Sequence, residues 1–272
     1  MKNINFLYLF IVLISIHSCS ALKKDLNANS PKIKKITTAL YVQGNREELN
    51  REEILTNYLF NIEIYNRFGS LIEKQHYDTE GKLSKKSIYQ FDGNNSPIKG
   101  FDFWDNPVRN EYWVSKHKRR QIENQYFNDK DELTATETIR YDARGNEIEK
   151  FKKSISGDTL IWIQFNYNAK NQLSKMKRYV IKGNEIRNFE YNKKNQMEVI
   201  KIRRDTISQK IESQYDENNN VILAKYINEK TGNVNETIYN YVYDAHGNWI
   251  TQKSSTNGKL NMIYEREIEY FE

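Results

Sequence analysis

The residues best suited to chemistry in this sequence are acids that recur at fixed offsets from a glycine. The string "YDARGNEIEK" starts at Tyr141, and nearly the same string, "YDAHGNWITQ", starts at Tyr243. Such a pattern could ligate a metal ion, form a ligand site or direct a backbone turn. The three roles imply different functions, and the residue types accepted at each position decide between them.

The motif occurs nine times, and its columns follow turn chemistry. The copies start at residues 65, 77, 91, 127, 141, 167, 191, 215 and 243. The second position is always Asp or Asn, whose side chains accept a hydrogen bond from the backbone N–H two residues later. The fifth is always Gly, Asn or Asp, the types that enter the left-handed region most easily. Asn replaces Asp in four of nine second positions, which a set of charged metal ligands would not tolerate. We therefore predict that Asp142, Gly145, Asp244 and Gly247 are structural turn residues.

The remaining reactive side chains form no recognisable catalytic pattern. The histidines are His17, His76, His117 and His246. The motifs of serine hydrolases (GxSxG), zinc proteases (HExxH) and phosphate-binding glycine loops do not occur. "NDKDE" resembles part of a calcium loop, but it lacks the glycine and the distant glutamate, and its Asn128 and Asp131 already occupy turn positions. The sequence predicts no catalytic residue, no metal site and no cofactor.

These turns need strands on both sides to position them. Ile161, Ile163, Phe165 and Tyr167 recur at every second position, as do Tyr239, Tyr241 and Tyr243, and a period of two is typical of half-buried strands. Early copies lie 12 or 14 residues apart and later ones 24 to 28, so the short interval is one strand plus a turn and the long one is a hairpin. With 38% hydrophobic, 13% aromatic and 29% charged residues, the composition favours an all-β fold with a thin core.

The motif resembles the YD repeat of the Rhs family, carried here by "YDARGNEIEKF" and "YDAHGNWITQK". The resemblance covers roughly Tyr65 to Glu272. In large Rhs proteins these repeats build a spiralling β-sheet shell around a toxin, and this chain has too few copies for a complete shell. The resemblance implies that residues 36–272 form an elongated, twisted antiparallel meander of about 14 to 20 strands, either flat or curled.

The N-terminus has the pattern of a bacterial lipoprotein signal. Lys2 precedes an apolar run from Phe6 to Ile16 that is too short to span a bilayer stably, and "IHSCS" follows. The box around Cys19, the single cysteine, resembles the lipoprotein cleavage site of a Bacteroidetes-like bacterium. It implies a helical signal peptide over 1–18, a lipid on Cys19 and a flexible tether over 19–35. Ser20 is not the Asp that retains lipoproteins in the inner membrane, so we expect an outer-membrane address, facing the periplasm or the surface.

The segment 101–120 is where the repeat degenerates and where a binding surface is expected. Aromatic rings beside cations can bind a glycan or peptide by stacking and charge, although a charged strand edge is an alternative explanation. The candidate residues are Trp104, Tyr112, Trp113, Lys116, Lys118, Arg119 and Arg120. Separately, Thr159 and Thr206 follow Asp at hairpin tips and resemble O-glycosylation sites of Bacteroidetes.

These observations favour a lipid-anchored, non-enzymatic binding or scaffolding protein of the cell envelope. The formal charge of +6 falls to +5 when Lys2 leaves with the signal peptide, and this excess favours envelope glycans or proteins over nucleic acid as partners. A periplasmic immunity protein against a secreted toxin is the alternative, and an envelope hydrolase is a third hypothesis. The sequence leaves the target and the oligomeric state open.

Overall fold

The computed structural model describes residues 31–42, 58–105, 108–180 and 183–272, and every regular element in these ranges is a β-strand. The strands are β1 (Ile33–Val42), β2 (Tyr58–Tyr65), β3 (Leu71–Tyr77), β4 (Leu83–Phe91), β5 (Pro97–Asp105), β6 (Val108–Lys118), β7 (Gln121–Asn128), β8 (Leu133–Tyr141), β9 (Glu147–Ser154), β10 (Thr159–Tyr167), β11 (Leu173–Val180), β12 (Gly183–Tyr191), β13 (Met197–Arg204), β14 (Ile207–Tyr215), β15 (Val221–Asn228), β16 (Val234–Tyr243), β17 (Trp249–Thr256) and β18 (Lys259–Tyr270).

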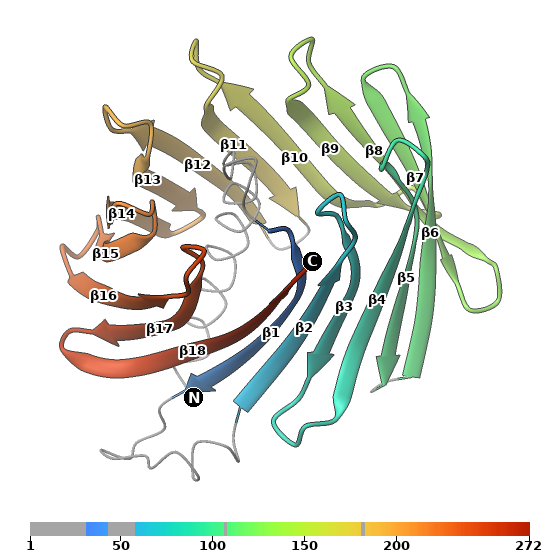
Figure 1. Cartoon of the computed structure of the whole chain (residues 1–272). Helices are drawn as coiled ribbons and strands as arrows, with labels where there is room; N and C mark the ends of the chain where they lie inside the picture. Colours follow the sequence, from blue (N-terminus) through green and yellow to red (C-terminus); the bar gives the residue numbers. More distant parts are fainter. Residues whose placement is uncertain (1–30, 43–57, 106–107, 181–182) are drawn as a thin grey trace.

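The strands form one closed antiparallel barrel (Figure 1). Each strand pairs with the next along the chain, and the ring closes at β1, where Ile36 lies opposite Glu63 on β2 and Ile268 on β18. The all-β prediction and the consecutive antiparallel hairpins are confirmed, but the open, elongated meander is wrong. Side chains alternate between the two faces along each strand in the same way in an open sheet and in a closed one. Closure depends instead on the stagger between neighbouring strands, summed over the whole ring. Closure also leaves no unpaired edge among the described strands.

The motif turns have the predicted geometry. All nine fifth positions have φ between +60° and +83°. In the copy at Tyr141, Oδ1 of Asp142 accepts hydrogen bonds from the backbone N–H of Arg144 at 2.8 Å and of Asn146 at 2.9 Å. Strand register shifts beside the turn, between Arg140 and Tyr141, as a bulge requires. The turn roles of Asp142 and Gly145 are confirmed, and Asp244 and Gly247 form the equivalent turn.

Seven of the nine motif turns lie at one end of the barrel, here called the motif end, because they join an even-numbered strand to the following odd one. Side chains link these turns around the rim. Asn146 Nδ2 donates to Asn171 Oδ1 at 2.6 Å, and Gln196 Nε2 donates to Asn219 Oδ1 at 2.9 Å. The motif therefore also ties each turn to its neighbour.

The motif tyrosines fasten one hairpin to the preceding one. The hydroxyl of Tyr191 donates to the carbonyl of Leu173 at 2.9 Å, and that of Tyr215 donates to the carbonyl of Met197 at 2.6 Å. A phenol that spans two strands in this way needs a fixed register between hairpins. The aromatic first position of the repeat is thus explained by barrel assembly.

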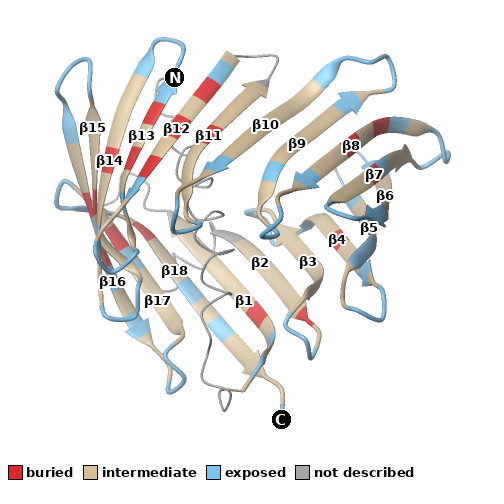
Figure 2. Ribbon diagram, turned by 90° about the horizontal axis from the view of Figure 1, so that it is seen from above, coloured by how far each residue is buried: buried red, intermediate tan, exposed pale blue. Residues whose placement is uncertain are grey.

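The inner face of the barrel carries the core. Residues directly opposite each other in antiparallel strands share a face, and Phe189, Ile200, Ile211 and Tyr226 form one such row across β12 to β15. By strand register, every buried side chain among the described residues falls on this face, as expected for the crowded concave side of a closed sheet. Figure 2 marks the buried residues on the strands around the barrel. The cluster comprises Met176, Phe189, Ile200, Ile202, Ile211, Ala224 and Tyr239.

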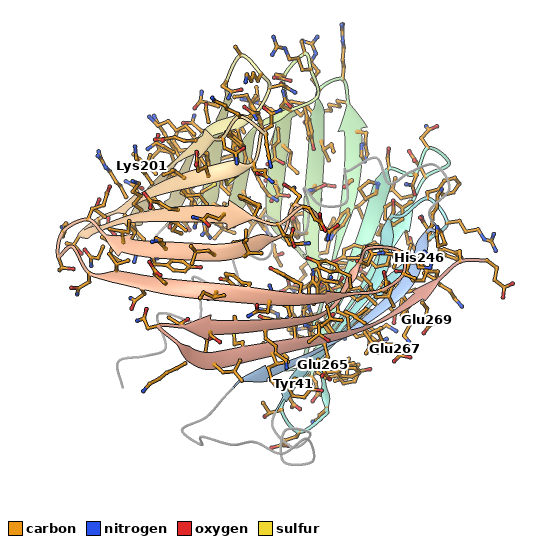
Figure 3. All side chains as sticks on the ribbon, turned by 60° about the vertical axis from the view of Figure 1, so that its left-hand side comes forward. Tyr41, Lys201, His246, Glu265, Glu267 and Glu269 are labelled. Atoms are coloured by element: carbon orange, nitrogen blue, oxygen red, sulfur yellow. The ribbon has the colours of Figure 1, made fainter. Side chains whose placement is uncertain are left out.

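The outer face is rich in paired charges. Lys201 Nζ lies 2.6 Å from Glu190 Oε1, and Lys225 Nζ lies 2.6 Å from Glu236 Oε1. In Figure 3, Lys201 is on the outer side of the wall and Glu265, Glu267 and Glu269 follow the outer side of β18. Exposed apolar side chains also occur on this face, among them Phe103 on β5, Val114 on β6, and Val234, Ile238 and Val242 on β16. The alternation along each strand therefore separates a core face from a largely charged face.

The predicted N-terminal organisation lies mostly outside the described residues. The signal peptide over 1–18 and the lipidation site Cys19 belong to that part. The first strand begins at Ile33, so the last three residues of the expected tether belong to β1. No helix with the length and hydropathy needed to cross a membrane occurs in the described ranges.

Candidate functional site on the inner wall

The structure distributes the predicted binding residues over both faces of the barrel. Trp104 and Trp113 are on the inner face, in rows with Lys85 and Tyr126 respectively. The outward residues are Tyr112, Lys116 and Lys118, and Arg119 and Arg120 form the turn between β6 and β7. The seven residues therefore do not make one platform.

The inward and the outward residues of the predicted set make separate contacts. On the inside, the Trp104 ring lies between two cations, with Lys85 Nζ 4.5 Å and Arg109 Cζ 4.2 Å from its centroid. Gly100 gives the Trp113 indole its space, because a Cβ there would overlap the ring. On the outside, Tyr112 stacks on Phe127 with centroids 4.9 Å apart.

The two threonines that resemble O-glycosylation sites are both exposed. Thr159 is the first residue of β10, and Thr206 lies in the turn between β13 and β14. Their exposure is compatible with modification, which remains a prediction.

The inner wall also carries charge, and five of its carboxylates are in ion pairs, whereas Glu147 has no ion-pair partner among the described residues. The pairs are Glu63 with Lys74, Asp102 with Lys85, Glu111 with Arg109, Glu137 with Lys150 and Glu185 with Arg187. Three further inward cations, Lys152, Arg178 and Arg266, have no ion-pair partner in the described parts of the chain. The central inner wall therefore has an excess of positive charge.

The most distinctive of these cations is Arg266, on β18. Its Cζ lies 3.3 Å from the centroid of the Trp249 ring. Its Nε is buried without a hydrogen-bond partner, and none of its guanidinium nitrogens donates to a described residue. Burial lowers the pKa of Arg266 to about 10, so the group stays protonated at neutral pH. Tyr241 and Tyr264 lie beside it, and these four residues are called the Arg266 cluster below.

The nearest carboxylate to this cluster is engaged elsewhere. Glu63 Oε1 accepts a hydrogen bond from Lys74 Nζ at 2.7 Å, and Oε2 accepts one from the Tyr65 hydroxyl at 2.8 Å. Burial alone would raise the pKa of Glu63, but the hydrogen bond and charge of Lys74 together with the Tyr65 hydroxyl bring it below its usual value. Glu63 is therefore ionised, and it attracts Arg266 without forming an ion pair.

The tyrosines of the cluster are held in their neutral form. Burial raises the pKa of Tyr241 to about 12. Its hydroxyl donates to the carbonyl of Val221 at 2.9 Å and accepts from Gln252 Nε2 at 2.8 Å. Burial also raises the pKa of Tyr264. At neutral pH the cluster thus presents one cation, two phenols and an indole.

Sequence reasoning missed the Arg266 cluster because the sequence does not show that Trp249, on β17, packs against Arg266, on β18. Glu63 and Arg266 meet only through the closure of β18 on β1 and β1 on β2. The alternation of Met262, Tyr264 and Arg266 could have placed these three on one face, but it could not have said which face is inside.

No family model and no curated protein matches this sequence. Among solved structures, a porin-like protein from Bacteroides uniformis is similar with a TM-score of 0.51 and 12% identity, covering 88% of this chain and 98% of that one. A porin-like protein from Bacteroides vulgatus matches with a TM-score of 0.25 and 10% identity, covering 89% and 99%. A TcdB2–TccC3–TEV structure matches with a TM-score of 0.28 and 10% identity, covering 76% of this chain and 14% of that one.

The first of these similarities shows the fold. It extends over nearly all of both chains, and the shared architecture is the barrel. The resemblance to the Rhs family is wrong for this chain, since no family model supports it and the sheet closes instead of running as an open meander. The repeated turn is a property of the hairpins, and it does not identify the family.

Proposed function

We propose that this chain is a non-enzymatic binding protein of the cell envelope, whose barrel stands in water and is held at the outer membrane by a lipid on Cys19. The observation that carries the proposal is the distribution of charge between the two faces of the wall. The outward face bears charged side chains in the middle of its strands, whereas all of the buried side chains of the described residues lie on the inward face.

A lipid-facing wall would need the opposite arrangement. At about 3.3 Å per residue, an eight-residue strand is about as long as the apolar band, roughly 25 Å tall, of an outer-membrane barrel. Lys201 and Lys225 are each the fifth of eight residues in β13 and β15, so both would lie near the middle of that band. A lysine at the bilayer midplane costs such a barrel roughly 2–4 kcal/mol. Outward charges on several adjacent strands therefore favour water.

The envelope location has two supports. The solved structure with a similar fold is described as porin-like, and the chain starts with a segment that has the features of a lipoprotein signal. A lipid anchor makes a water-facing barrel compatible with a membrane address, because stable anchoring requires acyl chains and not a membrane-embedded wall.

Fractionation of a Cys19→Ala variant tests this proposal, with the first 18 residues exchanged for a signal peptide that is cleaved without lipidation. We expect the unmodified chain in the membrane fraction and the variant in the soluble periplasmic fraction. A variant that stays in membranes through washes at high pH and in urea would overturn the proposal, because a wall embedded in lipid resists both washes.

A further inference from the structure

The Arg266 cluster has the composition of a binding site for an acidic sugar. The guanidinium is planar, lies over the Trp249 ring and makes no hydrogen bond to any described residue. A charged group in this state is expensive to keep on a half-buried wall unless a partner satisfies it. The structure therefore presents an arginine that is positioned but not paired.

The unpaired N–H donors of the Arg266 guanidinium favour an oxyanion as the ligand. Guanidinium forks match carboxylate and phosphate geometry with two parallel hydrogen bonds. The positive excess of the inner wall, with Lys152 and Arg178 also lacking ion-pair partners among the described residues, would further favour a negatively charged group. Glu63 accepts hydrogen bonds from Lys74 and Tyr65 and forms no ion pair with Arg266.

The surroundings of Arg266 favour a carboxylate borne on a sugar ring over a bare anion. Tyr264 precedes Arg266 by two residues on the same face, about 7 Å away by the rise of a strand. Its hydroxyl makes no hydrogen bond to a described residue, so it can serve a ligand hydroxyl. The Tyr241 and Trp249 rings, 6.2 Å apart, add flat apolar surface of the kind on which sugar C–H groups pack.

The site is also accessible from one end. Arg266 lies four residues before the end of β18, which reaches the motif end. At that end, the ring of His246 lies 4.5 Å from the ring of Tyr270. Arg266, Trp249 and Tyr264 all retain partial exposure. Trp249 is the first residue of β17, so a ligand entering at the motif end would meet the Trp249 ring before it reaches Arg266.

We propose that the Arg266 cluster binds a uronic acid unit of an envelope glycan, with Arg266 holding the carboxylate and Tyr264 donating to a ring hydroxyl. The inference deepens the proposed function and rests on it only in requiring that the inner wall be open to water. Lipidation of Cys19 plays no part in this binding, so failure of anchoring and failure of ligand binding can be told apart.

Calorimetric titration of the full chain, purified from membranes in mild detergent, tests the site. The probes are galacturonate, its methyl ester, galactose and inorganic phosphate. We expect galacturonate to bind, and the ester and galactose to bind at least tenfold more weakly. Phosphate that binds as tightly as galacturonate would overturn the assignment to a sugar, and equal binding of galactose would overturn the role of the carboxylate.

Variants assign the binding to the cluster. Arg266→Gln should weaken galacturonate binding at least tenfold. Arg266→Lys should weaken it by a smaller factor, because the lysine keeps the positive charge but cannot form the two parallel hydrogen bonds of a guanidinium group. Tyr264→Phe removes one hydroxyl from a wall that otherwise keeps its shape, and it should weaken galacturonate several-fold. Lys152→Gln is the matched control, since it removes another inward cation, and it should change binding less than twofold. Unchanged binding in both Arg266→Gln and Tyr264→Phe would refute the site.

Discussion

Lys210 and Ile211 are neighbours in β14 and point to opposite sides of the barrel wall. Ile211 is 1% exposed and lies opposite Ile200 and Tyr226 on the inner face. Lys210 points outward and forms an ion pair with Glu212, its Nζ 2.5 Å from Oε1. The peptide bond between Lys210 and Ile211 thus joins the outer surface of the barrel to the core.

The first prediction uses this neighbouring pair. Ile211→Ala should lower the free energy of unfolding by about 2–5 kcal/mol, because it removes buried methyl groups and leaves a cavity. Lys210→Ala is the control and should leave urea unfolding unchanged within error. Similar losses in the two variants would mean that the two faces have been assigned incorrectly.

The second prediction concerns the left-handed residue of the motif turn. Gly145 has φ of +82°, whereas Gly93, in the turn between β4 and β5, does not have a positive φ. At both positions a Cβ would meet no other group within 4 Å, so the two sites differ only in backbone conformation. Gly145→Ala should therefore destabilise the barrel by about 1 kcal/mol through backbone strain alone. Gly93→Ala should be neutral or slightly stabilising in the same thermal unfolding measurement, and a neutral Gly145→Ala would contradict the turn assignment.

The third prediction is a loss of stability at alkaline pH. Burial raises the pKa of Tyr167, Tyr215 and Tyr241 from 10 to about 12. A phenol whose pKa is higher in the folded state binds its proton more tightly there, so its contribution is complete below pH 10 and is lost as pH rises toward 12. The urea midpoint should be constant near neutral pH and should fall across this window.

The control for the alkaline measurement is Tyr215→Phe, which removes one ionising group. Its midpoint should start lower, because the hydrogen bond to Met197 is lost, and should then fall less steeply with pH than that of the unmodified chain. A midpoint that stays level between pH 10 and pH 12 would show that these phenols are not buried as described.

The sequence predicted local structure well and global structure poorly. Asp142 and Gly145 were assigned correctly because a turn is decided within five residues, by one side-chain acceptor and one left-handed backbone. Closure was missed because the pairing of Ile36 with Ile268 spans the whole barrel and depends on register summed over every hairpin. A repeat that determines the structure of each hairpin does not determine the number of hairpins at which the sheet closes.

The candidate site, like the fold, depends on contacts that the sequence alone did not predict. Trp104 and Tyr112 were grouped because they are near in sequence, yet the number of residues between them puts one inside and the other outside the barrel. Arg266 and Trp249 were overlooked because their contact joins two strands at the motif end. Alternation could sort residues into two faces, and only the closed sheet identifies the inner one.

The proposal that the barrel stands in water is tested most directly at Lys201, in the middle of the outer face of β13. If the proposal is correct, this side chain does not contact lipid. A Lys201→Cys variant offers the one free thiol of the lipidated chain, and an environment-sensitive fluorophore attached there can be exposed to brominated lipids in reconstituted membranes. We expect an emission spectrum typical of water and no quenching by bromine. A blue-shifted emission that brominated lipids quench would place this wall in the bilayer and contradict the proposed function.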